Sequence, residues 1–143
     1  MTQIAFHFGV PDKLAYTCRL LRKAVGTGAR VAVLAEAAMR SRLDADLWAL
    51  APTEFVPHCH DDAEALVQEL SPVLLLAEGA PAGPQRPVLV NLLDQVPASI
   101  DAYERLIEIV STDEADRQAA RARWKHYTEH GYTIVRHDVA RQG

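Results

Sequence analysis

The stretch "RVAVLAE", residues 30–36, decides the fold class of this chain. It is an apolar run rich in valine, which is typical of a strand that is buried on both faces. Two later stretches, "PVLLLAE" at 72–78 and "RPVLVNLL" at 86–93, have the same character. Strands of this kind belong to parallel sheets that helices cover on both sides.

The segments between these runs predict helices and further strands. Residues 11–26 begin with Pro11 and Asp12, end at Gly26 and carry apolar side chains at helical spacing, so one face should pack on the sheet. Other helices are expected at 37–50, 61–70, 99–106 and 111–131. Other strands are expected at 3–8, 54–58, 106–111 and 132–139. The alternation predicts an α/β fold, a single-domain Rossmann-like three-layer sandwich over residues 1–143, with a mostly parallel central sheet and helices on both faces.

The composition of the 143 residues is that of a globular domain, with 49% hydrophobic and 24% charged residues. No apolar run approaches the roughly 20 residues that cross a bilayer, and the first residues lack the basic start of a signal peptide, so we expect a cytoplasmic protein. The net charge of −4 argues against broad, sequence-independent binding to DNA. Two cysteines, Cys18 and Cys59, cannot form a disulfide framework.

The last predicted helix, within 111–131, differs in charge from the rest of this acidic chain. Ser111 and Glu114 have the spacing of a capping box, and Gly131 supplies a stop. Between Arg117 and Tyr127 there are four basic side chains, no acidic one, and a tryptophan. A local basic surface on an acidic protein favours a ligand with its own negative charge.

The helical spacing of this segment predicts two faces. At about 100° per residue, one arc holds the basic and aromatic side chains Arg117, Arg121, Trp124, Lys125 and Thr128. The opposite face holds small side chains and one histidine, Ala115, Ala119, Ala122 and His126. We therefore expect the alanine face to pack on the sheet and Trp124 to lie outward among cations. An indole with arginine forks suits an acidic peptide end, whereas the plainer alternative is a half-buried tryptophan with solvated charges.

Two separated motifs resemble one known family. "RARWKHYTEHGY" at 121–132 resembles the C-terminal signature of the chi subunit of bacterial DNA polymerase III, and "RLDADLWALAPTEFVPH" at 42–58 resembles a second signature of that family. The resemblance covers nearly the whole chain. The sequence departs from the family pattern at Trp124, where the family commonly has a tyrosine, and over residues 58–70, which have no clear counterpart in the family.

The resemblance implies a non-catalytic accessory subunit of the clamp-loader complex in DNA replication, without a cofactor. Chi pairs with the psi subunit and binds the acidic C-terminal tail of single-stranded DNA-binding protein, so its contact with single-stranded DNA is indirect and no membrane is involved. The implied tail-binding residues are Val110, Arg117, Arg121, Trp124 and Lys125, and the helical arc adds Thr128. The implied surface for psi, or for an alternative helicase partner, consists of Trp48, Phe55 and Pro57. Trp48 and Phe55 could instead simply cap the hydrophobic core.

Other functions have weaker support in the sequence. "HCHD" at 58–61 contains zinc-ligand residue types, but no second ligand cluster appears at the usual spacing, so no metal site is expected. No catalytic motif is present, and we expect no enzyme activity. The main alternative is a small nucleotide-binding α/β enzyme with its ligand near Glu36 or Asn91, beyond the ends of the strands. Direct stacking of single-stranded DNA on Trp124 is a further alternative.

Overall fold

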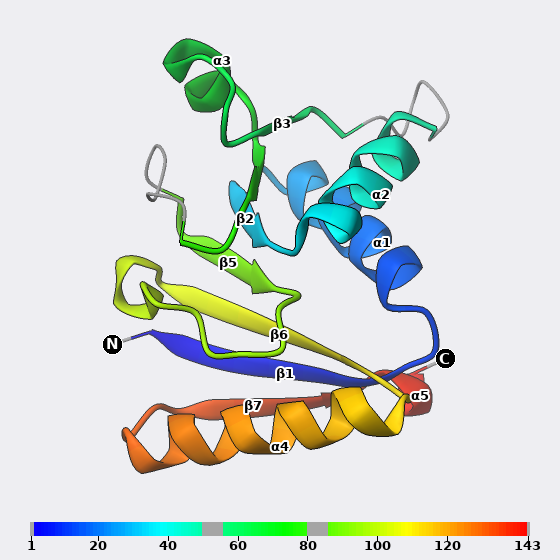
Figure 1. Ribbon diagram of the computed structural model, residues 1–143, viewed down its shortest axis with the longest axis vertical. Coiled ribbons are helices and arrows are strands. Elements are labelled where there is room, and N and C mark those ends of the chain that lie inside the picture. Colours follow the sequence, from blue (N-terminus) through cyan, green and yellow to red (C-terminus); the bar gives the residue numbers. More distant parts are fainter. Residues whose placement is uncertain (1, 50–55, 80–85, 143) are drawn as a thin grey trace.

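The computed structural model describes residues 2–49, 56–79 and 86–142 (Figure 1). The helices are α1 (Lys13–Gly26), α2 (Ala37–Trp48), α3 (Ala65–Leu70), the 3-10 turn η1 (Ile100–Ala102), α4 (Glu114–Glu129) and α5 (Val139–Gln142). The strands are β1 (Gln3–Val10), β2 (Val31–Leu34), β3 (His58–His60), β4 (Val73–Leu76), β5 (Val88–Asn91), β6 (Arg105–Ser111) and β7 (Ile134–Asp138). Phe55, one residue of the second predicted surface, lies outside the described residues.

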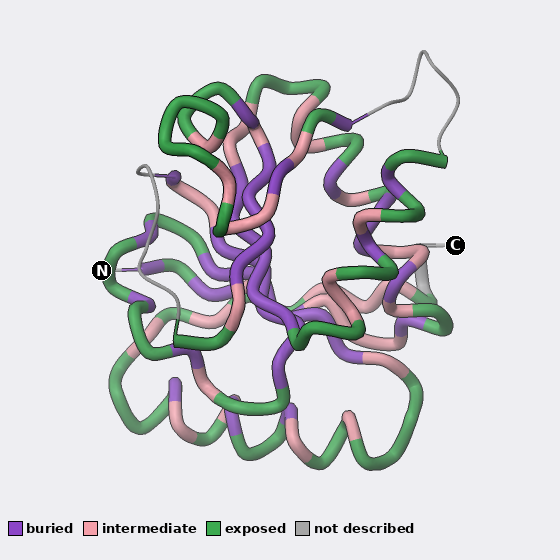
Figure 2. Tube along the Cα trace, turned by 45° about the horizontal axis from the view of Figure 1, so that its top comes forward, coloured by how far each residue is buried: buried purple, intermediate pink, exposed green. Residues whose placement is uncertain are grey.

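The strands form one seven-stranded sheet in the order β3-β4-β2-β5-β6-β1-β7. Every described pairing is parallel, which confirms the predicted α/β sandwich. Helices α1 and α2 cover one face of the sheet and α4 covers the other (Figure 1). The strands form the buried interior between these layers (Figure 2). None of the helices in the described part of the chain has the length and apolar character needed to cross a lipid bilayer.

The side chains of each strand alternate between two hydrophobic cores, because successive side chains of a strand point to opposite faces. In β2, Val31 and Val33 pack with α1 and α2, whereas Ala32 and Leu34 face the side of the sheet that α4 covers. All four are buried. This explains why the run at 30–36 is apolar at every position between Arg30 and Glu36.

Several element boundaries differ from those predicted. The expected helix at 99–106 is only the 3-10 turn η1, since Tyr103 and Ile100 are buried and their carbonyl oxygens lie 2.6 and 2.9 Å from the Thr2 hydroxyl, whose single proton they share. The chain then enters β6 at Arg105, which pairs with Gln3. The extended piece expected at 54–58 is β3 at 58–60, the expected helix at 61–70 is shortened to α3, and α5 was not predicted.

His7 lies on the opposite face of β1 from α4. Its Nδ1 is 2.5 Å from the hydroxyl of Tyr16 on α1, and its ring is tilted by 30° against that of His137 with the centroids 4.7 Å apart. Burial, followed by the positive charges of His137 and Arg105, lowers the pKa of His7 from 6.5 to about 4. The imidazole is therefore neutral in the folded protein at neutral pH.

Acid should destabilise the fold through His7. Because the unfolded chain binds the proton at pH 6.5 and the folded chain only near pH 4, the stabilisation is complete above 6.5 and is lost as the pH falls towards 4. We expect the free energy of unfolding, measured by urea denaturation, to fall less between pH 7 and pH 4.5 in His7→Asn than in the wild type. The same change at exposed His130 should leave that loss unaltered. An equal loss in the wild type and His7→Asn would contradict the assignment.

Candidate functional site

Helix α4 begins two residues later than its capping-box spacing suggested. Its N-cap is Asp113, whose carboxylate accepts a hydrogen bond from the Asp116 backbone N–H at 3.2 Å. Ser111 was the wrong N-cap because it still belongs to β6, where it pairs with Val10. Gly131, with a φ of 78°, ends the helix as predicted.

The face of α4 that packs on the sheet is not the predicted alanine face. The buried side chains are Ala120, Arg123 and Tyr127, whereas Ala115 and Ala122 are exposed. The prediction was wrong because Arg123 and Tyr127 have a buried partner on β6 that the periodicity of one helix cannot reveal. His126, expected in the core, is half-buried and stacks on His130 instead.

That buried partner is Glu108, which is fully buried at the middle of β6. Its carboxylate lies 3.1 Å from Nε of Arg123 and accepts hydrogen bonds from the hydroxyl of Tyr127 at 2.5 Å and from the amide of Asn91 at 3.1 Å. Arg123 also donates to the carbonyl oxygen of Asp94 at 2.8 Å. Burial raises the pKa of Glu108, and the charge of Arg123 offsets part of that rise. This cluster was not predicted, although a glutamate inside the apolar run 106–110 was a signal for it.

With α4 held in this orientation, Trp124 lies at the edge of the helix–sheet contact. It is half-buried, and its ring packs against that of Phe6 on β1 with the centroids 5.0 Å apart. Beside it is a pocket of about 640 Å³ between α4, the C-terminal ends of β1 and β6, and β7. The residues lining this pocket are Phe6, Phe8, Gly9, Val110, Ser111, Thr112, Arg117, Ala120, Arg121, Trp124, Arg136 and Asp138.

Three arginines line the pocket. The guanidinium of Arg136 on β7 is 5.8 Å from the Trp124 ring centroid and 5.3 Å from that of Phe8, within the range of cation–π contacts. Arg117 and Arg121 project from α4 and share the carboxylate of Glu114, at 3.5 and 3.4 Å. Ion pairs this exposed contribute little to the stability of the fold. A ligand carboxylate can therefore take the place of Glu114.

The pocket brings together four of the six residues predicted for one site: Val110, Arg117, Arg121 and Trp124. Two residues of the predicted set, Lys125 and Thr128, do not line it. The side chain of Lys125 is 80% exposed and 4.0 Å from Glu129. The hydroxyl of Thr128 donates to the Trp124 carbonyl at 2.9 Å. Arg136 was missed because strand pairing, not spacing along α4, places it there.

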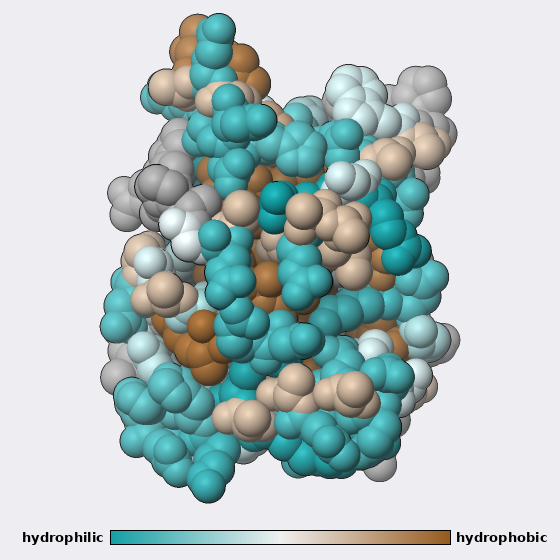
Figure 3. All heavy atoms as spheres, viewed as in Figure 1, coloured by the Kyte–Doolittle hydropathy of each residue, from teal (hydrophilic) through white to brown (hydrophobic). Residues whose placement is uncertain are grey.

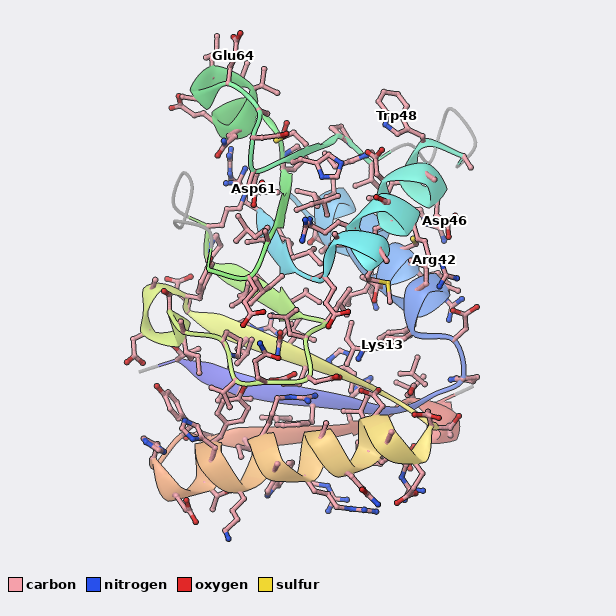
Figure 4. The ribbon with its side chains drawn as sticks, in the orientation of Figure 1. Lys13, Arg42, Asp46, Trp48, Asp61 and Glu64 are labelled. Atoms are coloured by element: carbon pink, nitrogen blue, oxygen red, sulfur yellow. The ribbon has the colours of Figure 1, made fainter. Side chains whose placement is uncertain are left out.

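The second predicted surface lies at the end of α2. The Trp48 side chain is 63% exposed and projects from that end (Figure 4). Its ring lies edge-on to His58, 5.7 Å between centroids, and His58 is held by Asp44 and the Val56 carbonyl, both at 2.7 Å. Pro57 is exposed beside them. Phe55, the third member of this predicted surface, is not among the described residues.

The positions considered for other ligands are arranged differently. The amide group of Asn91 is fully buried and donates to Glu108, while its oxygen accepts from the Leu93 N–H at 3.0 Å. The polar atoms of the Asn91 side chain are therefore already used in hydrogen bonds within the protein. Glu36 is exposed, at the N-cap of α2. Within 2–49, 56–79 and 86–142, no three His, Cys, Asp or Glu side chains are grouped as metal ligands.

Comparison with known proteins identifies the family of the chain. Residues 1–135 match the family model described as DNA polymerase III chi subunit, HolC. The chain belongs to the DNA polymerase III chi subunit family. It is 35% identical to DNA polymerase III subunit chi of Pseudomonas aeruginosa, over 99% of both chains. It is 28% identical to subunit chi of Haemophilus influenzae, over 85% of this chain and 84% of the relative. Its relatives are therefore chi accessory subunits of a replicative polymerase.

Proposed function

We propose that this chain is a single-domain, non-catalytic chi subunit that links the clamp-loader complex of DNA polymerase III to single-stranded DNA-binding protein in the cytoplasm. It does so by binding the acidic C-terminal tail of that protein. The observation that carries the proposal is the pocket beside Trp124, where apolar rings and three arginines meet. Contact with single-stranded DNA is then indirect, through the bound protein.

The pocket supports this ligand because its two kinds of surface match the two parts of such a tail. The rings of Phe6 and Trp124 offer apolar area to a terminal aromatic side chain. Arg117 and Arg121 can form bidentate pairs with the free carboxylate or the acidic side chains before it. Lys125, exposed one residue beyond Trp124, adds positive charge along the approach.

The exposed Trp48 and Pro57 support a second protein contact, for which the family offers psi or an alternative helicase partner. A tryptophan that is 63% exposed at a helix end is the type of side chain that anchors protein interfaces. Trp48 ends helix α2, which covers the opposite face of the sheet from α4, so both partners can bind one chi subunit.

Charge reversal in the pocket tests the proposal. We expect Arg121→Glu to weaken binding of a fluorescent tail peptide at least about tenfold, because a pairing cation becomes a repelling anion. Lys125→Glu should weaken it less, since Lys125 does not line the pocket. Fluorescence anisotropy at two salt concentrations measures both effects, and circular dichroism should show an unchanged fold.

The matched control is Lys23→Glu, an exposed reversal on α1 at the opposite face of the sheet. It should leave affinity for the tail near that of the wild type. Equal affinity of Arg121→Glu and wild type would show that the tail binds elsewhere.

A further inference from the structure

Helix α3 exposes its hydrophobic side chains. None of its six residues is buried, and Leu66, Val67 and Leu70 are 63%, 45% and 72% exposed. Leu66 and Leu70 are four residues apart and so lie on one side of the helix. Figure 3 shows hydrophobic surface at the tip of the molecule that α3 forms. In the described part of the chain, three of the five exposed large hydrophobic side chains belong to this one short helix, and such a cluster marks a contact site.

The exposure is fixed by the way α3 is attached. The buried guanidinium of Arg86 donates to the carbonyl oxygens of Gln68 and Ser71, both at 2.6 Å. The Gln68 side chain donates to the carbonyl oxygens of Asp61 and Ala63, at 3.0 and 2.8 Å. Polar groups thus hold the inner side and the C-terminal end of α3. Its leucines are left to face outward.

The charges around α3 are one-sided. Residues 58–70 contain four acidic residues and no lysine or arginine, while the other 15 acidic residues equal the 15 basic ones of the chain. The whole formal charge of −4 therefore arises in this segment. Its side chains Asp62, Glu64 and Glu69 are exposed, and Glu64 points outward from the start of α3 (Figure 4). Of the nearby cations, Arg86 is buried and Arg30 donates to the backbone carbonyl of Glu69.

The negative charge around α3 limits the kinds of molecule that could bind there. Nucleic acid, anionic lipid and an acidic tail would all be repelled by Asp62, Glu64 and Glu69. Two copies of the chain meeting through α3 about a two-fold axis would bring these acids together. The remaining class is a polypeptide with apolar side chains flanked by lysine or arginine.

We propose that α3 is a docking surface for a basic amphipathic segment of another protein. The apolar side chains of that segment cover Leu66, Val67 and Leu70, and its lysine or arginine side chains face Asp62 and Glu64. The surface adjoins β3, at the opposite edge of the sheet from β7 and the arginine-lined pocket. Binding at α3 is therefore independent of the proposed tail binding, and the two sites can be filled at once.

Binding of two matched peptides tests this proposal. The probes are a short fluorescent helical peptide with a leucine face and lysines elsewhere, and its counterpart with glutamate for lysine. We expect saturable binding of the lysine peptide only. Leu66→Ser with Leu70→Ser should weaken it at least about tenfold, because both apolar contacts are lost. Asp62→Asn with Glu64→Gln should weaken it several-fold and reduce its salt dependence.

The controls are Val135→Ser, an exposed apolar change on β7, and Glu104→Gln, an exposed acid before β6. Neither should alter binding of the lysine peptide. The proposal is overturned if that peptide does not bind, if the glutamate peptide binds equally, or if the serine pair changes nothing. A concentration-dependent dimer abolished by the serine pair would overturn it in favour of a second copy. Should the serine pair lower the Tm, the Asp62/Glu64 pair decides, since both side chains are exposed.

Discussion

Arg123→Met is expected to cost about 3–5 kcal/mol of folding free energy, the usual loss when one partner of a buried ion pair is removed. The side chains of Arg123 and Glu108 are 2% and 0% exposed, and their closest atoms are 3.1 Å apart. Without the guanidinium, the carboxylate of Glu108 stays buried with hydrogen bonds from Tyr127 and Asn91 only. Urea unfolding followed by circular dichroism measures the loss.

A double variant separates the charge from the packing. Glu108→Gln with Arg123→Met keeps an acceptor for Tyr127 and Asn91 but removes both charges, so it should be more stable than Arg123→Met alone. The exposed change Arg105→Met at the start of β6 should stay within about 0.5 kcal/mol of the wild type. If the single variant were as stable as the double one, Arg123 would not be compensating a buried charge.

The same cluster gives the effect of Arg123→Met a pH dependence. Burial raises the pKa of Glu108 above its ordinary 4.5, and loss of Arg123 raises it further. A carboxyl group with a raised folded-state pKa destabilises the fold increasingly as the pH rises from its unfolded-state pKa to its folded-state pKa, and does not do so below the unfolded-state value. The deficit of Arg123→Met should therefore shrink as the pH is lowered towards 4.5.

The fold could be predicted largely because its signals are local. Strands buried on both faces need apolar side chains along their length, and the strands within 30–36, 72–78 and 86–93 satisfy that need within themselves, except at Asn91. The face of α4 could not be predicted in this way. Its contact with the sheet depends on Glu108, on another element, which turns Arg123 inward and leaves Ala115 and Ala122 exposed.

The same distinction applies to the pocket. Arg117, Arg121 and Trp124 lie on one helix, so helical spacing alone groups them. Arg136 and Phe6 are 130 positions apart in the chain and meet because β1 and β7 pair in the register that places Phe6 beside Arg136. A single sequence gives no direct signal for such a pairing. The third arginine of the pocket therefore emerged only from the structure.

The indole of Trp124 should be the side chain on which tail binding depends most. It packs on Phe6 at 5.0 Å and has the Arg136 guanidinium 5.8 Å from its ring, so it links the apolar and cationic parts of the pocket. We expect Trp124→Ala to weaken tail-peptide binding by about 30-fold or more, the range of an aromatic interface hot spot. Trp124→Tyr keeps a ring against Phe6 and should change affinity only a few-fold.

Two further measurements make this prediction specific to the pocket. Trp48→Ala, at the other proposed surface, removes an exposed indole of the same size and should leave tail affinity unchanged. Trp124→Ala also loses packing against Phe6, so its Tm must be compared with that of Trp124→Tyr before affinities are interpreted. If a folded Trp124→Ala protein bound the tail as tightly as Trp124→Tyr, the ring would not contact the ligand. The arginines alone would then have to account for binding, and affinity should vanish at high salt.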